Sequence, residues 1–310
     1  MSFVKVEHLW VKYGAFEAVK SLSFSIPKGE VFGFIGPNGA GKTSTIRVMA
    51  TLRMPTAGWV LINNIDVSSK PHLARRLIGY MPDFFGVYDD LTVNEYLLFF
   101  AAAYQVEWKK REKIIGDVLE LTDLTAKRHS QVNDLSRGMK QRLGLARVLI
   151  HDPEFLLLDE PASGLDPRAR IEMRELLKEL KNMGKTILIS SHILPELSEL
   201  CTRIGIIEQG KLIAEGSIDE IYRSLDVKRN IHVQVANLTR DLIEMMKKVK
   251  GVSMVKEDLD RLSIEIDEKL IAPEDLNAEL HKIGAKVRMF QPQAMDMESA
   301  FMRLTEGKVQ

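Results

Sequence analysis

The sequence predicts a doubly wound α/β domain followed by a smaller α+β domain. Short apolar strands alternate with amphipathic helices over about residues 3–225, the pattern of a sheet covered by helices. Residues 155–158, Phe-Leu-Leu-Leu, form a continuously apolar run, which is typical of strands buried on both faces of a parallel sheet. Near residue 226 the pattern restarts, and 310 residues are long for one domain. We therefore expect domains at 1–225 and 226–310.

The N-terminal domain is expected to combine strands with a helical segment. Residues 3–9 and 22–26 alternate like edge strands, and from about residue 91 to residue 151 the pattern becomes helical. Thr92 is a predicted N-cap, with Glu95 completing a capping box. The other predicted strands and helices lie, in chain order, at 31–35, 59–62, 78–81, 108–121, 136–149, 155–158, 167–183, 186–190 and the hairpin 204–214.

The C-terminal domain shows weaker but regular patterns. Alternating apolar residues predict strands at 231–235, 252–255, 262–266 and 287–289. Helices are predicted at 242–249, from Pro273 onward and at 295–304, since proline favours the first position of a helix. This part of the sequence contains no motif that indicates a particular chemistry.

A glycine-rich stretch after the strand at 31–35 predicts a phosphate site. It fits the spacing G-x-x-x-x-G-K-[ST], lies between a strand and a helix, and would point successive backbone N–H groups at an anion. Its lysine can reach the β- and γ-phosphates, and its threonine hydroxyl can ligate Mg²⁺. The sequence therefore predicts nucleoside triphosphate binding through Gly36, Pro37, Asn38, Gly39, Ala40, Gly41, Lys42, Thr43 and Ser44.

An acidic pair follows the buried strand at 155–158. Open α/β folds place their ligands at the carboxyl ends of the strands, where Asp159 and Glu160 stand. Asp159 can hold Mg²⁺ through water, and Glu160 can polarise the water that attacks the γ-phosphate. Phosphoryl transfer depends on positioning and charge neutralisation, which Lys42, Mg²⁺ and a fixed water would provide.

The start of the helix at 136–149 predicts a second anion site. Ser136 is a good N-cap, and the helix behind it presents free N–H groups at its positive end. One nucleotide hardly needs two such sites in one chain. Two chains packed head to tail would use both, because each would donate this helix end to the γ-phosphate of the other.

Together, these motifs resemble the nucleotide-binding subunit of an ABC (ATP-binding cassette) transporter over about residues 3–225. The motifs stand in the family's order: Gly36 to Thr43 (Walker A), Leu135 to Gln141 (signature), Phe155 to Glu160 (Walker B), Ser163 to Asp166 (D-loop) and His192 (switch). The resemblance implies a P-loop ATPase cassette with a mostly parallel sheet core, an antiparallel β subdomain and a helical subdomain at about 91–151.

The resemblance also implies roles for single residues. Glu160, His192 and Lys42 would be catalytic, with His192 touching the γ-phosphate, and Thr43 and Asp159 would hold Mg²⁺. Ser136 and Gly138 would contact the ATP bound to a second copy, and Asp166 would lie at the homodimer interface. Tyr13 stands where the family stacks an aromatic ring on adenine; its loop position alone also fits a partly exposed hairpin tyrosine.

Two residues depart from the family pattern. Asp83 follows Tyr80-Met81-Pro82 where the family usually has glutamine, and an ionised carboxylate can only accept hydrogen bonds. We therefore expect Asp83 to take a metal-side role. Arg137 replaces a signature glycine; it either adds a cation near the phosphate of the partner copy or points to solvent, and solvent is favoured because arginine is mostly exposed.

The aromatic stretch 84–88, Phe-Phe-Gly-Val-Tyr, lies where the family receives a coupling helix of the membrane subunit. Phe85 and Tyr88 are candidate anchors for that helix, with core packing as the alternative. The ending 297–305 resembles single-cassette subunits of bacterial and archaeal exporters. For residues 226–310 we expect a regulatory or dimer-stabilising role, with a passive extension as the alternative.

Composition limits the remaining possibilities. Lys+Arg and Asp+Glu are equal at 43, so the basic excess typical of nucleic-acid binders is missing. The single Cys201, the lack of a signal-like start and the lack of an 18-residue apolar run favour a cytoplasmic protein. We expect an ATPase motor, peripheral on the cytoplasmic face of the membrane and paired with a separate permease subunit. The alternatives are a soluble ABC-type ATPase acting on ribosomes or DNA, and a nucleotide-binding regulator that hydrolyses poorly.

Overall fold

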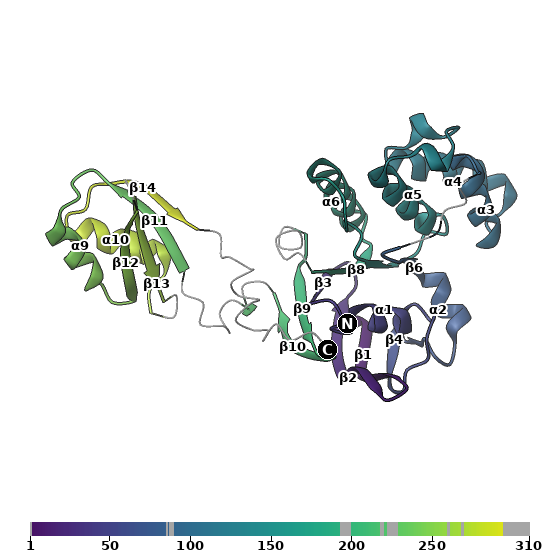
Figure 1. The fold of residues 1–310 in the computed structure, drawn as a ribbon, viewed down its shortest axis with the longest axis horizontal. Helices are drawn as coiled ribbons and strands as arrows, with labels where there is room; N and C mark the ends of the chain where they lie inside the picture. The colour runs from purple at the N-terminus through teal and green to yellow at the C-terminus, as the bar shows by residue number, and fades with distance from the viewer. Residues whose placement is uncertain are drawn as a thin grey trace. The chain divides into compact units, whose positions relative to one another are not determined.

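The computed structural model describes most of the chain, in two units (Figure 1). One unit runs to residue 216 and the second comprises residues 217–306. The expected domain boundary at 225–226, the last predicted helix at 295–304 and the segment 297–305 lie outside the described residues. Those described are 2–84, 86, 90–192, 200–217, 220–221, 229–258, 261–267 and 270–293.

The centre of the first unit is a six-stranded sheet in the order β10-β9-β3-β8-β7-β6. The neighbouring strands β9, β3, β8, β7 and β6 pair in parallel, and only the hairpin strand β10 is antiparallel. Every residue of β3 and β7 is buried, which accounts for the continuous apolar run in β7. The strands are β3 (Val31–Ile35), β6 (Ile78–Met81), β7 (Phe155–Asp159), β8 (Thr186–Ser191), β9 (Arg203–Glu208) and β10 (Lys211–Gly216).

A second, antiparallel sheet has the order β2-β1-β4-β5, formed by β1 (Ser2–Tyr13), β2 (Phe16–Pro27), β4 (Ala57–Ile62) and β5 (Ile65–Asp66). The expectation that residues 3–9 form an edge strand is wrong, because β1 lies between β2 and β4. Both hairpin strands are also longer than expected. The alternation is broken by register shifts near His8, whose φ is 47° and whose N–H donates to Ser23 Oγ at 2.9 Å.

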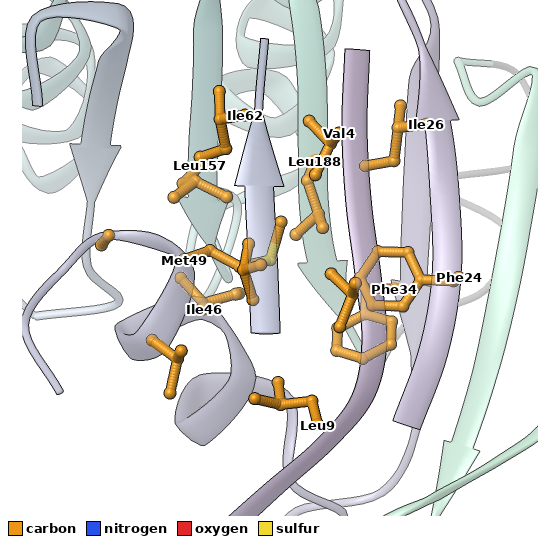
Figure 2. Close-up of a cluster of buried hydrophobic side chains, with 14 of the residues drawn as sticks. Val4, Leu9, Phe24, Ile26, Phe34, Ile46, Met49, Ile62, Leu157 and Leu188 are labelled. Atoms are coloured by element: carbon orange, nitrogen blue, oxygen red, sulfur yellow. The ribbon is translucent and has the colours of Figure 1, made fainter. Parts of the chain in front are cut away.

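The hydrophobic core lies between these sheets. Helix α1 (Lys42–Met49) packs on β2 of one sheet and β7 of the other. Figure 2 shows Ile46 and Met49 of α1 among side chains from both sheets, such as Phe24 and Leu157, and all four are buried. Helix α1 is thereby fixed on two sides, and the loop that precedes it starts from a rigid base.

The other helices of this unit are α2 (Pro71–Leu77), α3 (Val93–Ala103), α4 (Trp108–Leu121), α5 (Arg137–Leu149) and α6 (Pro167–Asn182), with short 3₁₀ turns η1 (Thr125–Lys127) and η2 (Val132–Asp134). Figure 1 shows α3, α4 and α5 gathered as one group, and contacts join each pair of them. The capping box of α3 is present, with Glu95 N donating to Thr92 Oγ1 at 3.3 Å. In the described residues, no helix is long and apolar enough to cross a membrane.

The second unit has the order of elements β-α-β-β-α-β that is typical of ferredoxin-like domains. Its antiparallel sheet has the order β12-β13-β11-β14. Buried residues of both helices pack with those of the sheet in one cluster. The elements are β11 (Arg229–Val235), α9 (Arg240–Lys247), β12 (Val252–Asp258), β13 (Arg261–Ile266), α10 (Pro273–Lys282) and β14 (Val287–Pro292).

The cysteine of the first unit is inaccessible. Cys201 is a buried free thiol, and burial raises its pKa to about 12. A thiol with so high a pKa is a small apolar side chain at neutral pH.

Candidate active site

The loop between β3 and α1 forms one wall of the candidate site. Gly41 is the N-cap of α1 with φ of 107°, a conformation that residues with a Cβ rarely adopt, and it offers no side-chain acceptor to the helix. At Gly36 a Cβ would lie 2.2 Å from the carbonyl oxygen of Ile207 in β9, so a larger residue does not fit. The first amides of α1 therefore lack a side-chain cap and are suited to an anion at the positive end of the helix.

The side chain of Lys42, the first residue of α1, turns into this loop. It is 6% exposed, and its Nζ donates to the carbonyl oxygens of Gly36 at 2.6 Å and Pro37 at 3.3 Å. Glu160 Oε1 lies 3.5 Å from the same nitrogen. Burial lowers the pKa of Lys42, and the Glu160 carboxylate opposes this shift. The loop thus holds its ammonium group between the backbone carbonyls and the Glu160 carboxylate.

Asp159 and Glu160 differ sharply in their surroundings. Asp159 is the last residue of β7 and is 1% exposed. Glu160 follows with φ of 53°, the left-handed region that non-glycine residues seldom occupy and that costs about 1–3 kcal/mol. Its Oε2 lies 2.8 Å from His192 Nδ1, so this nitrogen carries the hydrogen when the pair forms a hydrogen bond. One carboxylate is therefore fixed in the sheet, and the other reaches into the site.

Ser190, in the neighbouring strand β8, joins the two acidic residues. Its hydroxyl donates to Asp159 Oδ1 at 2.6 Å and accepts from the backbone N–H of Glu160 at 3.0 Å. The same N–H also lies 3.2 Å from the Ser190 carbonyl oxygen. These bonds stabilise the left-handed turn at Glu160 and orient the Asp159 carboxylate. This role of Ser190 was not predicted from the sequence, where the only signal for it is a serine at the end of an apolar run.

Asp83 follows β6 and faces the same acidic residues. Burial raises the pKa of its carboxyl group, and the negative charges of Asp159 and Glu160 raise it further. Arg137 and His192 oppose the shift. Asp83 is thus close enough to the acidic pair for their charges to act on its carboxyl group.

A cavity of about 240 Å³ lies among these residues at the end of the sheet. Tyr13 lies at this cavity, 39% exposed, with its hydroxyl 3.3 Å from Ser44 Oγ. The guanidinium of Arg53 covers the Tyr13 ring at 3.7 Å, a cation–π contact between residues forty positions apart that no sequence motif indicates. The cavity is lined by Tyr13, Phe16, Ala18, Pro37, Asn38, Gly39, Ala40, Gly41, Lys42, Thr43, Ser44, Asp83 and Glu160.

The other predicted site residues fall into two groups. Gly36, Asp159 and His192 lie just behind the lining, each bonded to a lining residue or adjacent to one in the chain. Ser136, Gly138 and Asp166 belong to the starts of other helices and do not line the cavity.

These helix starts are capped by their own side chains. Ser136 caps α5, its hydroxyl accepting from Met139 N at 3.3 Å. Asp166 caps α6, its Oδ1 accepting from Ala169 N at 2.9 Å. Within one chain, Ser136, Gly138 and Asp166 therefore do not line the cavity at α1.

Arg137 is exposed, as expected, but its guanidinium also donates to the carbonyl oxygen of Ser163 at 3.0 Å. The aromatic stretch is only partly described: Phe84 is 88% exposed, and Phe85, Val87 and Tyr88 lie outside the described residues.

Comparison with known proteins gives a consistent result. The family model for ABC transporters matches residues 19–163. The Nod factor export ATP-binding protein I of Burkholderia orbicola is 36% identical over 304 residues, covering 96% of this chain and 95% of that protein. The linearmycin resistance ATP-binding protein LnrL of Bacillus subtilis is 32% identical over 306 residues, covering 97% and 98%. Matches of this length include the second unit.

Solved structures resemble the first unit. The ATP-binding subunit of an ABC transporter superposes with a TM-score of 0.65 at 31% identity, covering 72% of this chain and 93% of the other. A dimeric post-hydrolysis state of the cassette MJ0796, bound to ADP and Pi, gives a TM-score of 0.62 at 28% identity, covering 69% and 98%. The α/β cassette fold expected from the sequence is therefore confirmed.

Proposed function

This chain belongs to the ABC transporter family as an ATP-binding ATPase subunit of the exporter type, and from that premise we propose that it is a motor subunit. ATP binding would close a head-to-tail homodimer and hydrolysis would reopen it. A separate integral membrane subunit would convert this cycle into export. The protein would then lie on the cytoplasmic face of the membrane, held there by its partner.

Nucleotide binding would use the cavity at the end of the six-stranded sheet. The triphosphate would take the amides at the start of α1, and Lys42 would exchange the carbonyls of Gly36 and Pro37 for phosphate oxygens. The open face of the Tyr13 ring would stack on the adenine, since Arg53 already covers the other face.

The oxygen groups at this site fit Mg²⁺, which takes one or two carboxylates together with substrate phosphates. Thr43 lines the cavity, and Ser190 orients the Asp159 carboxylate, so Thr43 and Asp159 would hold the ion, with Asp83 beside them. The ion would neutralise charge on the phosphates. In the described residues, no group of three or more His, Cys, Asp or Glu side chains gathers as a separate metal site.

Hydrolysis would depend on Glu160. Its carboxylate would polarise the attacking water, since its backbone is held by Ser190 and its Oε2 by His192. His192 would place its other ring nitrogen near the γ-phosphate. The short contact between Glu160 and His192 is the observation that carries this part of the proposal.

The second group of residues would act on the ATP of a partner copy. Ser136 and Gly138 at the start of α5 and Asp166 at the start of α6 lie outside the cavity of their own chain. A head-to-tail dimer would bring Ser136 and Gly138 to the partner's γ-phosphate and place Asp166 at the interface between the two copies. The dimeric MJ0796 cassette supports this arrangement as an analogy.

The proposal can be tested with Glu160→Gln, which keeps the shape of the side chain and removes the base. We expect this variant to lose ATPase activity by about 10²–10⁴-fold, the usual loss when a general base is removed, and to trap ATP. Light scattering after size exclusion should then show a dimer only with ATP and Mg²⁺. Glu154→Gln, the same change at a surface ion pair with Lys28, should leave both activity and mass as in the wild type.

Three results would contradict the proposal. Full ATPase activity in Glu160→Gln would remove Glu160 from catalysis. A Glu160→Gln protein that binds ATP yet stays monomeric, both alone and in native membranes, would contradict the dimer. Failure to co-purify with any integral membrane protein from its own host would contradict the motor role.

A further inference from the structure

The signature helix and the D-loop are joined within this chain by Arg137. This residue is the first of α5, and its guanidinium donates to the Ser163 carbonyl oxygen at 3.0 Å. The same guanidinium lies over Gly164, where a Cβ would be only 2.2–2.5 Å from its atoms. Gly164 also has φ of +65°, so its backbone conformation and its lack of a side chain both match this contact.

Two further contacts continue this junction along α5 and α6. A Cβ at Gly138 would lie 2.9 Å from the Cβ of Ala169, so the first turns of the two helices touch closely. One turn on from there, Arg142 Nη2 lies 3.7 Å from a Glu172 carboxylate oxygen. The start of α5 is therefore held to the D-loop and to α6 at three successive points.

The residues that would face a partner cassette lie at both sides of this junction. Ser136 directly precedes Arg137, and Asp166 caps α6 three residues after Ser163. A flexible loop between them would let the two groups reach the partner independently. A fixed loop makes them one surface.

We propose that Arg137 is a positioning residue that holds residues 163–166 against the start of α5, so that Ser136 and Asp166 meet the partner cassette as a single unit. The inference rests on the dimeric mechanism proposed above. It gives a role to the arginine that replaces the family's glycine. The planar guanidinium is suited to it, because it can donate to a carbonyl and lie flat over Gly164 at the same time.

The first test compares Arg137→Ala and Arg137→Lys with the wild type in steady-state ATPase assays. Arg137→Ala should lower kcat about tenfold, within the hundredfold that a misplacement of about 1 Å can cost, and leave the KM for ATP unchanged. Arg137→Lys keeps a hydrogen-bond donor but lacks the planar guanidinium, so its kcat should lie between those of the wild type and Arg137→Ala. Arg76→Ala, an exposed arginine on α2, is the control for losing an arginine and should match the wild type.

The second test is a double-mutant cycle with Gly164→Ala. A methyl group at residue 164 displaces the guanidinium, so Gly164→Ala already breaks the contact. Arg137→Ala should then lower kcat little further in the Gly164→Ala background, although it lowers kcat about tenfold in the wild type. Losses that simply multiply would show that the two residues act separately and would overturn the proposal.

A third measurement does not depend on dimerisation. The loop amides of Ser163 and Leu165 donate to the carbonyls of Glu160 at 3.0 Å and Ala162 at 3.3 Å. In the chain without nucleotide, Arg137→Ala should speed hydrogen exchange at these two amides and leave exchange in α4 unchanged. Unchanged exchange at both amides, together with wild-type kcat, would overturn the role of Arg137 while leaving the motor function intact. A wild-type protein without ATPase activity would instead overturn the motor function.

Discussion

The starts of α1 and α5 are both helix ends suited to an anion, yet they are built differently. At α1 the cap is Gly41, which offers no side chain to the helix amides, and the next residue is the buried Lys42. At α5 the cap is Ser136, whose hydroxyl already accepts from Met139 N, and the next residue is the exposed Arg137. The start of α1 lines a cavity closed by other parts of the same chain; the start of α5 does not.

In the proposed dimer, this difference would separate a site that one chain completes from a site that a second chain completes. Around α1 the chain supplies the lysine, the acidic pair and the aromatic ring. Around α5 it supplies a capped helix end tied to a neighbouring loop, which is a rigid surface rather than a pocket. The helix dipole attracts anions at the N-terminal start of each of these two helices, but the surroundings decide how many other groups reach the anion.

The largest expected effect comes from removing the lysine of α1. Lys42→Ala should weaken ATP binding and lower turnover by about 10²–10³-fold, the loss typical of a preorganised charged donor. Binding can be followed by calorimetry and turnover by phosphate release. Lys28→Ala removes a surface lysine paired with Glu154 and serves as the control. Wild-type ATP affinity in Lys42→Ala would show that the phosphates bind elsewhere and that the start of α1 is not the nucleotide site.

A smaller and different effect is expected at α5. Ser136→Ala should leave the affinity of the monomer for ATP unchanged, because Ser136 lies outside the cavity of its own chain. Its kcat should fall about tenfold, which corresponds to the loss of about 1.4 kcal/mol of transition-state stabilisation with one phosphate contact. Loss of the cap should also reduce the free energy of unfolding by about 1 kcal/mol, measured by urea titration. A fall in monomer affinity like that of Lys42→Ala would show that both helix ends serve one nucleotide.

The smallest expected effect concerns how α5 is anchored at its other end. His151, just after α5, donates from Nε2 to the Ile78 carbonyl oxygen at 2.9 Å and stacks on Tyr104. Burial lowers its pKa, so below its ordinary value of about 6.5 the unfolded chain binds a proton that the folded chain does not. Stability should therefore fall as the pH drops from about 6.5 toward the folded-state pKa, and not above 6.5.

The matched variant for this prediction is His151→Gln, which keeps a donor for Ile78 and cannot titrate. Its Tm should fall less than that of the wild type between about pH 7 and about pH 5, the range around the ordinary histidine pKa. Equal slopes in the two proteins would show that folding does not change how His151 binds protons, and so that its burial does not penalise the charged form.

The sequence predicted elements well where local patterns and buried faces agree. The helix α4 (Trp108–Leu121) and the strand β7 were expected within a residue of their ends, because amphipathic spacing and an apolar run are local properties. The predicted strands of the β1–β2 hairpin were too short, because the bulge at His8 interrupts the alternation of apolar residues. The shape of a bulged strand depends on its partner, which alternation alone does not reveal.

The site residues could be predicted from the sequence where motifs indicate their chemistry. Contacts made to backbone atoms, or set by the order of strands, could not. The loop of α1 and the acidic pair were expected from residue types and spacing. The contact of Arg137 with Ser163 joins a side chain to a carbonyl 26 residues away, and every residue has a carbonyl. Likewise, the bridge made by Ser190 depends on β8 lying beside β7, which only the strand order shows.

The buried cysteine makes this protein a convenient host for chemical probes. Because Cys201 is buried and its thiol stays protonated at neutral pH, maleimide or spin-label reagents should not react with it while the fold is intact. It is also the single cysteine of the chain. Reporter groups can therefore be attached at chosen positions on α5 or α6 without first removing a native thiol, and labelling of Cys201 itself would register unfolding.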